Sequence, residues 1–154
     1  MNKRLFLMAS ATMLTSLALG GAYGQNVGKQ AISSPNAPEA IGPYSQAIKS
    51  GRTVYLSGQI AIDPKTKQLI SNASIEDQTR LVLENLKAVL ATDGLTMDSI
   101  VSATVFLTDL TDFAKMNEVY ATYFKNTPPA RATVEVAHLP RSAKVEISAI
   151  AVHP

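Results

Sequence analysis

Two charged residues in strand-like, largely apolar stretches are the strongest candidates for chemistry. Arg131 opens the stretch RATVEVA, and Glu146 lies between Val145 and Ile147. A guanidinium offers two parallel N–H donors that match a planar carboxylate. A buried carboxyl group needs a partner or a raised pKa, and it suits a general acid or base or a group that positions water. The alternatives are a solvated arginine at a strand end and an outward-facing glutamate on a half-exposed strand.

Five further residues carry little information singly. A tyrosine here is as compatible with the core as with a pocket, and a serine followed by glycine suits an ordinary strand end. The serine has no histidine in a triad-like context, and no Gly-x-Ser-x-Gly motif is present, so it is no obvious nucleophile. These residues are Tyr44, Ser57, Gly58, Asn117 and Thr133.

Thiol and metal chemistry find few ligands in this sequence. The chain has no cysteine and two histidines, His138 and His153. Cysteine-based catalysis is therefore excluded, and a histidine-rich zinc site cannot form within one chain. His138 is expected at the surface. We predict no metal and no cofactor.

Residue patterning predicts the element order β-β-α-β-α-β-β. A turn at 50–52 joins two strands within 44–58, and further strands are expected at 100–108, 131–137 and 144–152. One helix begins at Ser74, carries an apolar stripe at helical spacing and ends at Asp93-Gly94. A second helix is expected to be capped by Asp112 and to stop before Pro128.

This order predicts a two-layer α+β domain in which both helices cover the same face of one sheet. The apolar face of the second helix comprises Phe113, Met116, Tyr120, Tyr123 and Phe124. The other sheet face is too apolar for water, so we expect a second subunit to cover it.

The N-terminus has the pattern of a secretory signal peptide. Lys3 and Arg4 precede an uncharged, apolar-rich run at 5–21, and Ala22-Tyr23-Gly24 offers small residues for a peptidase. The prediction is a cleaved segment at 1–24, an irregular segment at 25–40 and one domain at 41–154; an uncleaved membrane anchor is the alternative. Cleavage implies export, to the periplasm or, without an outer membrane, to the medium.

Cleavage also changes the charge balance. The whole chain has 14 basic and 12 acidic residues, and removal of Lys3 and Arg4 leaves 12 of each. A mature chain without net charge lacks the basic excess that drives binding to a phosphate backbone. We therefore predict no nucleic-acid partner and, after cleavage, no membrane association.

Six motifs in one register resemble the RidA/YjgF family. The first is IGPYSQA at 41–47, and the second is SGQI at 57–60. Stretches from both helices and the two final strands follow in the family's order. They are QT at 78–79, NLKAVL at 85–90, DFAKMNEVY at 112–120, and PARATVEVA at 129–137 with LP at 139–140 and VEI at 145–147.

The resemblance implies a chorismate-mutase-like fold and a homotrimer with sites between subunits. It implies hydrolysis of 2-imino acids or enamines, such as 2-iminobutanoate and 2-iminopropanoate, to 2-keto acids and ammonia. Arg131 would bind the substrate carboxylate and Glu146 would orient or activate water, as the catalytic pair. The other five candidates match pocket positions, with Thr133 where some members have cysteine.

Other functions stay open on sequence grounds. The same cleft and arginine suit a non-catalytic module that binds a small carboxylate. Ribonuclease, translation-inhibitor and chaperone-like activities are ascribed to some relatives. The neutral mature chain and the expected export disfavour an RNA substrate.

Overall fold

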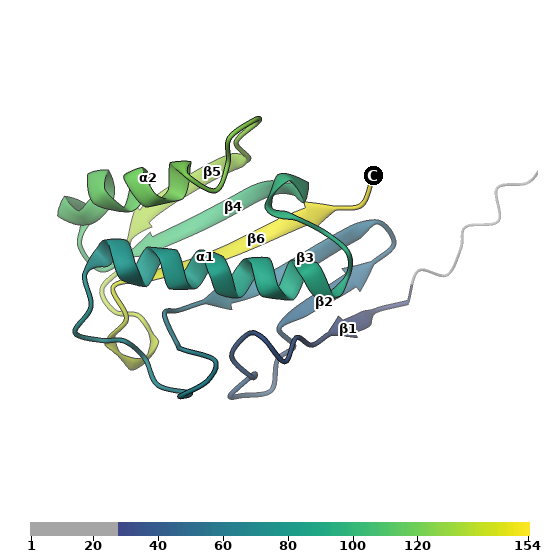
Figure 1. Cartoon of the computed structure of the whole chain (residues 1–154), viewed down its shortest axis with the longest axis horizontal. Coiled ribbons are helices and arrows are strands. Elements are labelled where there is room, and N and C mark those ends of the chain that lie inside the picture. The colour runs from purple at the N-terminus through teal and green to yellow at the C-terminus, as the bar shows by residue number, and fades with distance from the viewer. Residues whose placement is uncertain (1–27) are drawn as a thin grey trace, which may run out of the picture.

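The computed structural model describes residues 28–154, which form one six-stranded mixed sheet and two helices (Figure 1). Along the chain the elements are β1 (Gln30–Ile32), β2 (Ala47–Ser50), β3 (Thr53–Gln59), α1 (Ile75–Thr92), β4 (Ile100–Leu107), α2 (Phe113–Ala121), β5 (Ala130–Glu135) and β6 (Val145–Val152). The strand order is β1-β2-β3-β6-β4-β5, and only β4 and β5 are parallel among these neighbours.

Both helices lie on the same face of this sheet, which confirms the predicted α+β class (Figure 1). The central strand β6 shows why one face is covered: Val145 and Ile147 are buried, whereas Glu146 and Ser148 are partly exposed. Successive side chains of a strand point to opposite faces, so the odd positions pack beneath the helices. The even positions lie on the sheet face that this chain leaves open.

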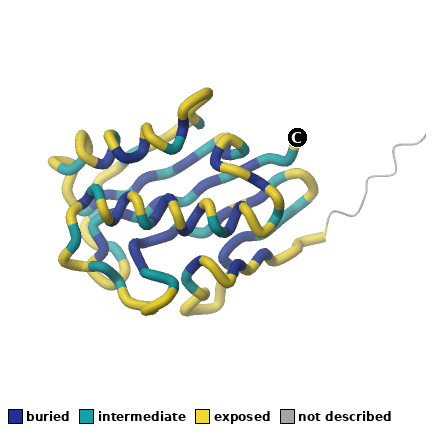
Figure 2. The backbone as a smooth tube through the Cα atoms, viewed as in Figure 1, coloured by how far each residue is buried: buried dark blue, intermediate teal, exposed yellow. Residues whose placement is uncertain are grey.

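Helix α1 forms as predicted. The Ser74 hydroxyl accepts a hydrogen bond from the backbone N–H of Asp77 at 3.1 Å, and Gly94 follows the helix with a φ of +71°. Both are standard ways to satisfy the free backbone groups at helix ends. The predicted stripe faces the sheet, as Figure 2 shows by its alternating buried and exposed turns. Its buried members are Ile75, Val82, Leu83, Leu86, Val89 and Leu90.

Helix α2 corrects the predicted cap. Asp112 stands at the N-cap position, but its side chain caps no N–H group. Asp109 instead accepts from the backbone N–H of Thr111 at 2.8 Å, in a short 3-10 turn that leads into α2. Because the 3-10 turn at Leu110–Asp112 runs directly into α2, the first free backbone N–H groups lie in that turn. The capping side chain is therefore Asp109, three residues before Asp112. The helix also ends at Ala121, well before Pro128.

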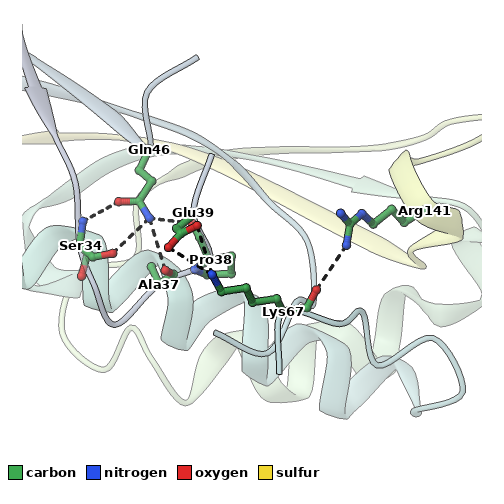
Figure 3. Close-up of polar contacts among 7 residues, drawn as sticks. All are labelled: Ser34, Ala37, Pro38, Glu39, Gln46, Lys67 and Arg141. Carbon is green, nitrogen blue, oxygen red and sulfur yellow. Dashed lines mark hydrogen bonds and ion pairs between the residues drawn. The ribbon is translucent and has the colours of Figure 1, made fainter. Parts of the chain in front are cut away.

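Strand β1 lies in the segment that was expected to be irregular. It is three residues long and pairs antiparallel with β2, with Ala31 opposite Ile48. The buried Gln46 side chain forms hydrogen bonds with the segment that follows β1, at residues 34–38. As Figure 3 shows, its side-chain amide donates to the Pro38 carbonyl at 2.6 Å, and its oxygen accepts from the Ser34 N–H. So short a strand carries too few alternations to be recognised from sequence.

The open sheet face carries exposed apolar side chains. Tyr55 and Val101 are each 50% exposed, and a shallow cavity between β3, β6 and β4 lies on this region. Cover by a second subunit stays a prediction.

The expected signal peptide at 1–24 lies outside the described residues. Within 28–154, neither helix is long and apolar enough to cross a membrane.

A polar clasp joins β6, β2 and the end of α1. Asp93 lies 2.6 Å from His153 Nε2 and 3.1 Å from Lys49 Nζ. Burial alone raises the pKa of Asp93, but the hydrogen bonds from His153 and Lys49 and the charge of Lys49 outweigh it, and the pKa lies below its usual value.

Because the pKa of Asp93 is lowered by folding, its stabilising effect is present above the unfolded-state pKa of about 3.9 and is lost as pH falls through the lower folded pKa. We expect Asp93→Asn to reduce the free energy of unfolding by about 1 kcal/mol at neutral pH, with a difference that shrinks below about pH 4. Urea unfolding across pH measures this. Asp112→Asn is the control, and a loss for Asp93→Asn that does not change with pH would refute the clasp.

Candidate functional site

The structure places the candidate residues in two separate cavities. Tyr44, Ser57, Gly58 and Glu146 line one cavity. Asn117 and Arg131 line another, together with aromatic and proline side chains. The two predicted catalytic residues therefore do not meet within one chain.

Glu146 lines a cavity of about 330 Å³ between the end of β3 and the start of β6. Apolar side chains form most of its wall, and the polar groups come from the loop before β2 and from β3. The lining residues are Ile41, Tyr44, Ser57, Gly58, Ile60, Ile62, Pro140 and Glu146. A mostly apolar hollow with a few directed polar groups is the usual form of a small-molecule site.

Glycine at position 58 makes room for the Glu146 side chain. A Cβ at Gly58 would come within 2.8 Å of Glu146 Cδ and would overlap its Oε1. The ladder between β3 and β6 is also irregular between Leu56 and Gln59. The carboxyl group therefore lies directly over the β3 backbone, and this position has a requirement for glycine that sequence alone did not reveal.

Burial raises the pKa of Glu146. Within residues 28–154, no side chain pairs with this carboxyl group in a hydrogen bond or ion pair that offsets the desolvation. A carboxyl group with a raised pKa and an open approach can exchange a proton with a bound molecule or with water.

Tyr44 and Ser57 differ in how free their hydroxyls are. Tyr44 is 47% exposed, which excludes the core-aromatic alternative, and its hydroxyl accepts a 3.4 Å hydrogen bond from the Ile41 N–H. The Ser57 hydroxyl donates to the Ser45 carbonyl at 2.7 Å, so its proton is already engaged. Ser57 can accept a hydrogen bond from a ligand, whereas Tyr44 can also donate one.

Arg131 lies at the edge of a second cavity, of about 390 Å³, between α2 and the start of β5. Asn117 contributes an amide from α2, and Pro128 and Pro129 form the wall that leads into β5. The remaining lining residues are Tyr120, Ala121 and Phe124. A cation and an amide beside apolar walls suit a small anion with an apolar substituent.

The Arg131 guanidinium contacts two aromatic rings. Its central carbon lies 4.5 Å from the centre of the Tyr120 ring and 5.9 Å from that of Phe113. No carboxylate or carbonyl in residues 28–154 accepts a hydrogen bond from its side-chain N–H groups. Sequence reasoning had assigned both aromatic residues to the core face only, although Tyr120 follows Asn117 by one helical turn and so had to share its face.

The sheet explains why the two cavities are apart. Arg131 pairs with the buried Ala103 on β4, so it lies on the helix side of the sheet. Glu146 pairs with Phe106 on the same strand and lies on the open side. Thr133 follows Arg131 on the helix side but lines neither cavity.

The histidines stand apart from both cavities. His138 is exposed, as predicted, and His153 belongs to the Asp93 clasp. In residues 28–154, no group of three or more histidine or acidic side chains is arranged to hold a metal ion.

From the raised pKa of Glu146 we predict how the free energy of unfolding depends on pH. The neutral carboxyl favours the folded state at low pH, and this advantage is lost as pH rises through the folded pKa. At pH 7 we expect Glu146→Gln to have a higher free energy of unfolding in urea than wild type. The difference should be less than about 1 kcal/mol because the group is partly solvated, and below about pH 4 the two proteins should have equal stability. The exposed Glu118→Gln is the control. Equal stability of wild type and Glu146→Gln at every pH would contradict a desolvated carboxyl.

Comparison with known proteins gives the family. The family model described as Endoribonuclease L-PSP matches residues 34–153. A RutC family protein from Pyrococcus horikoshii is 53% identical over 123 residues, which cover 80% of this chain and 97% of the relative. The 2-iminobutanoate/2-iminopropanoate deaminase of Mus musculus is 46% identical over 124 residues, 80% of this chain and 91% of that protein.

A solved structure agrees with both. Escherichia coli TdcF with bound serine is 46% identical, has a TM-score of 0.78, and matches 81% of this chain and 99% of its own. The match extends over nearly all of the described domain, including both cavities. The chain belongs to the RidA/YjgF family, the family of the Endoribonuclease L-PSP model.

Proposed function

We propose that this protein is a deaminase that hydrolyses 2-imino acids and enamines, such as 2-iminobutanoate and 2-iminopropanoate, to 2-keto acids and ammonia. The observation that carries the proposal is the unpaired Arg131 guanidinium at the edge of a cavity. Its planar donors suit a 2-imino carboxylate, and a desolvated carboxyl group, Glu146, is available for proton transfer. The mouse relative named as such a deaminase supports it.

We further propose that the working protein is a homotrimer in which each site lies between two subunits. One chain presents an unpaired cation on one face of its sheet and an unpaired acid on the other. The exposed apolar residues of the open face, such as Tyr55 and Val101, favour cover by another copy. Such an arrangement brings Arg131 of one subunit to the Glu146 cavity of the next.

In the proposed reaction, Arg131 binds the substrate carboxylate through two N–H groups and so fixes the neighbouring C=N carbon. Glu146 and nearby backbone carbonyls hold a water molecule, and the carboxylate removes a proton as the water oxygen bonds to that carbon. The C=N electron pair moves to nitrogen. Glu146 then returns this proton to the nitrogen, which gives the neutral carbinolamine. A second proton, taken by Glu146 from the carbinolamine hydroxyl and passed to the nitrogen, accompanies cleavage of the C–N bond, so ammonia leaves as the keto group forms.

This chemistry demands positioning more than activation. The imine carbon is already electrophilic, and one positioned acid or base contributes roughly 10²–10⁴-fold. The residues of the two cavities are therefore sufficient for the proposal, with no cofactor invoked. The location we propose, outside the cytoplasm after removal of 1–24, follows from the N-terminal sequence pattern.

The test is imine hydrolysis by the purified mature chain. An amino-acid oxidase generates 2-iminobutanoate in place, and semicarbazide traps the imine that remains. We expect wild type to accelerate imine loss, and Arg131→Ala and Arg131→Lys to reduce kcat/KM roughly 30-fold or more, because neither side chain replaces the two-pronged contact. Arg80→Lys, an exposed arginine outside both cavities, is the control.

If the folded wild-type oligomer binds 2-oxobutanoate but does not accelerate imine loss, the protein is a carboxylate-binding module and not a deaminase. Full activity of Arg131→Lys would refute the carboxylate contact.

A second variant tests the Glu146 cavity. The methyl group of Gly58→Ala must displace the Glu146 carboxyl, so we expect kcat to fall at least about 10-fold. Gly94→Ala is the matched control, because Gly94 has a φ of +71° with nothing near its Cβ position. That control should lose about 1 kcal/mol of stability through backbone strain while keeping kcat. Normal kcat in Gly58→Ala would show that the Glu146 position is not needed.

A further inference from the structure

The Arg131 side chain lies against two aromatic rings and has no carboxylate partner among residues 28–154. Its guanidinium carbon lies 4.5 Å from the Tyr120 ring centre and 5.9 Å from the Phe113 ring centre. Among residues 28–154, no carboxylate or carbonyl accepts from its side-chain N–H groups. A cation over an aromatic ring needs no hydrogen-bond acceptor, so the N–H groups that point away from the rings stay available to a ligand.

An arginine in a ligand site meets two opposing needs. A free side chain loses rotamer entropy when it binds, whereas a carboxylate partner that fixed it would compete with the ligand for the same N–H groups. Cation–π contact avoids the conflict, since it orients the guanidinium plane and consumes no donor.

Tyr120 is itself rigid enough for this role. It is 5% exposed, and its ring packs on Phe124 with centres 4.6 Å apart. Phe124 is also buried, so the ring beneath Arg131 is held from behind by the core. The fixed ring therefore defines where the guanidinium lies relative to the cavity that Asn117 shares.

The Tyr120 hydroxyl does not account for the residue's position. It is buried and has no partner with hydrogen-bond geometry in the described part of the chain. Burial raises the pKa of Tyr120, and the nearby Arg131 guanidinium offsets this only in part. A buried hydroxyl without a partner adds nothing to folding and carries a desolvation cost. The Tyr120 ring, in contrast, contacts both the Arg131 guanidinium and the Phe124 ring.

We propose that Tyr120, assisted by Phe113, is a positioning residue that orients the Arg131 guanidinium for the substrate carboxylate. The inference rests on the proposed function, because the carboxylate is that of the 2-imino acid. It assigns a role in substrate binding to two aromatic residues that act through Arg131. Phe113, which is farther from Arg131 and 39% exposed, contributes less.

The experiment separates the ring from the hydroxyl. Tyr120→Phe keeps the aromatic face, whereas Tyr120→Leu removes it, and both are assayed for imine hydrolysis and for binding of 2-oxobutanoate by calorimetry. We expect Tyr120→Phe to keep KM and Kd within about twofold. Loss of the cation–π contact in Tyr120→Leu should raise both roughly 2- to 30-fold, with a smaller change in kcat.

Tyr123→Leu, in the turn that follows α2, is the matched control. Tyr123 donates to Glu84 at 2.8 Å and lies outside the Arg131 cavity. Its loss should lower the melting temperature and leave KM unchanged. Should Tyr120→Leu fail to fold, Phe113→Leu at the partly exposed ring provides the test, with an expected rise in KM of roughly three- to fivefold.

A spectroscopic readout reports the contact directly. In ¹⁵N-labelled protein, the Arg131 Nε–Hε signal is assigned by its loss in Arg131→Ala. Ring currents should displace this signal in wild type and Tyr120→Phe, and Tyr120→Leu should return it towards the position of a free arginine. Tyr123→Leu should leave it in place.

The outcomes distinguish this inference from the proposed function. Two results would overturn the positioning role and leave the deaminase proposal standing. One is an unmoved Arg131 signal together with a normal KM in Tyr120→Leu. The other is a rise in KM in Tyr120→Phe as large as the rise in Tyr120→Leu. Failure of wild type to hydrolyse the imine overturns the function instead, and the signal and 2-oxobutanoate binding still report whether the rings orient Arg131.

Discussion

The alternation of side chains along the central sheet is the constraint on which the site depends. On β6, Val145 and Ile147 must face the helices to complete the core, so Glu146 necessarily faces the other way. On β5, the register with β4 places Arg131 on the helix side. A shift of one residue in β6 would turn Glu146 into the core, and a shift of one residue in β5 would turn Arg131 onto the open face. The same packing that stabilises the fold therefore keeps the two candidate catalytic groups apart in one chain.

Each charged group is maintained differently in its cavity. Glu146 lies over Gly58 without a compensating partner among the described residues, and burial raises its pKa. Arg131 is placed by aromatic rings, and no carboxylate or carbonyl among the described residues occupies its N–H donors. The pKa of the Glu146 carboxyl is thus adjusted by desolvation, whereas the Arg131 cation is adjusted by its orientation. These are the two properties that a proton-transfer group and a carboxylate-binding group respectively require.

Much of this could be predicted from sequence because the signals were periodic. The stripe from Ile75 to Leu90 and the β-branched strands gave the right element types and the right helix face. Strand β1 was missed because three residues carry no period, and Asp112 was given a capping role that Asp109 has in the preceding turn. The residue types were enough to predict the candidate site residues. Their division between the two faces of the sheet depends on strand order and register, which the sequence pattern does not show. Tyr120 was assigned to the core because an aromatic residue at helical spacing looks the same in both roles.

The placement of Arg131 and Glu146 on opposite faces also has a consequence for genetics, given the proposed assembly. One allele that lacks the arginine and another that lacks the glutamate would each encode an inactive protein. In a cell that expresses both, some mixed oligomers would contain an interface with one intact half from each chain, so the two defects would complement one another. Two alleles damaged in the same cavity would not. The pattern of complementation among alleles would therefore map which residues belong to which half of the site.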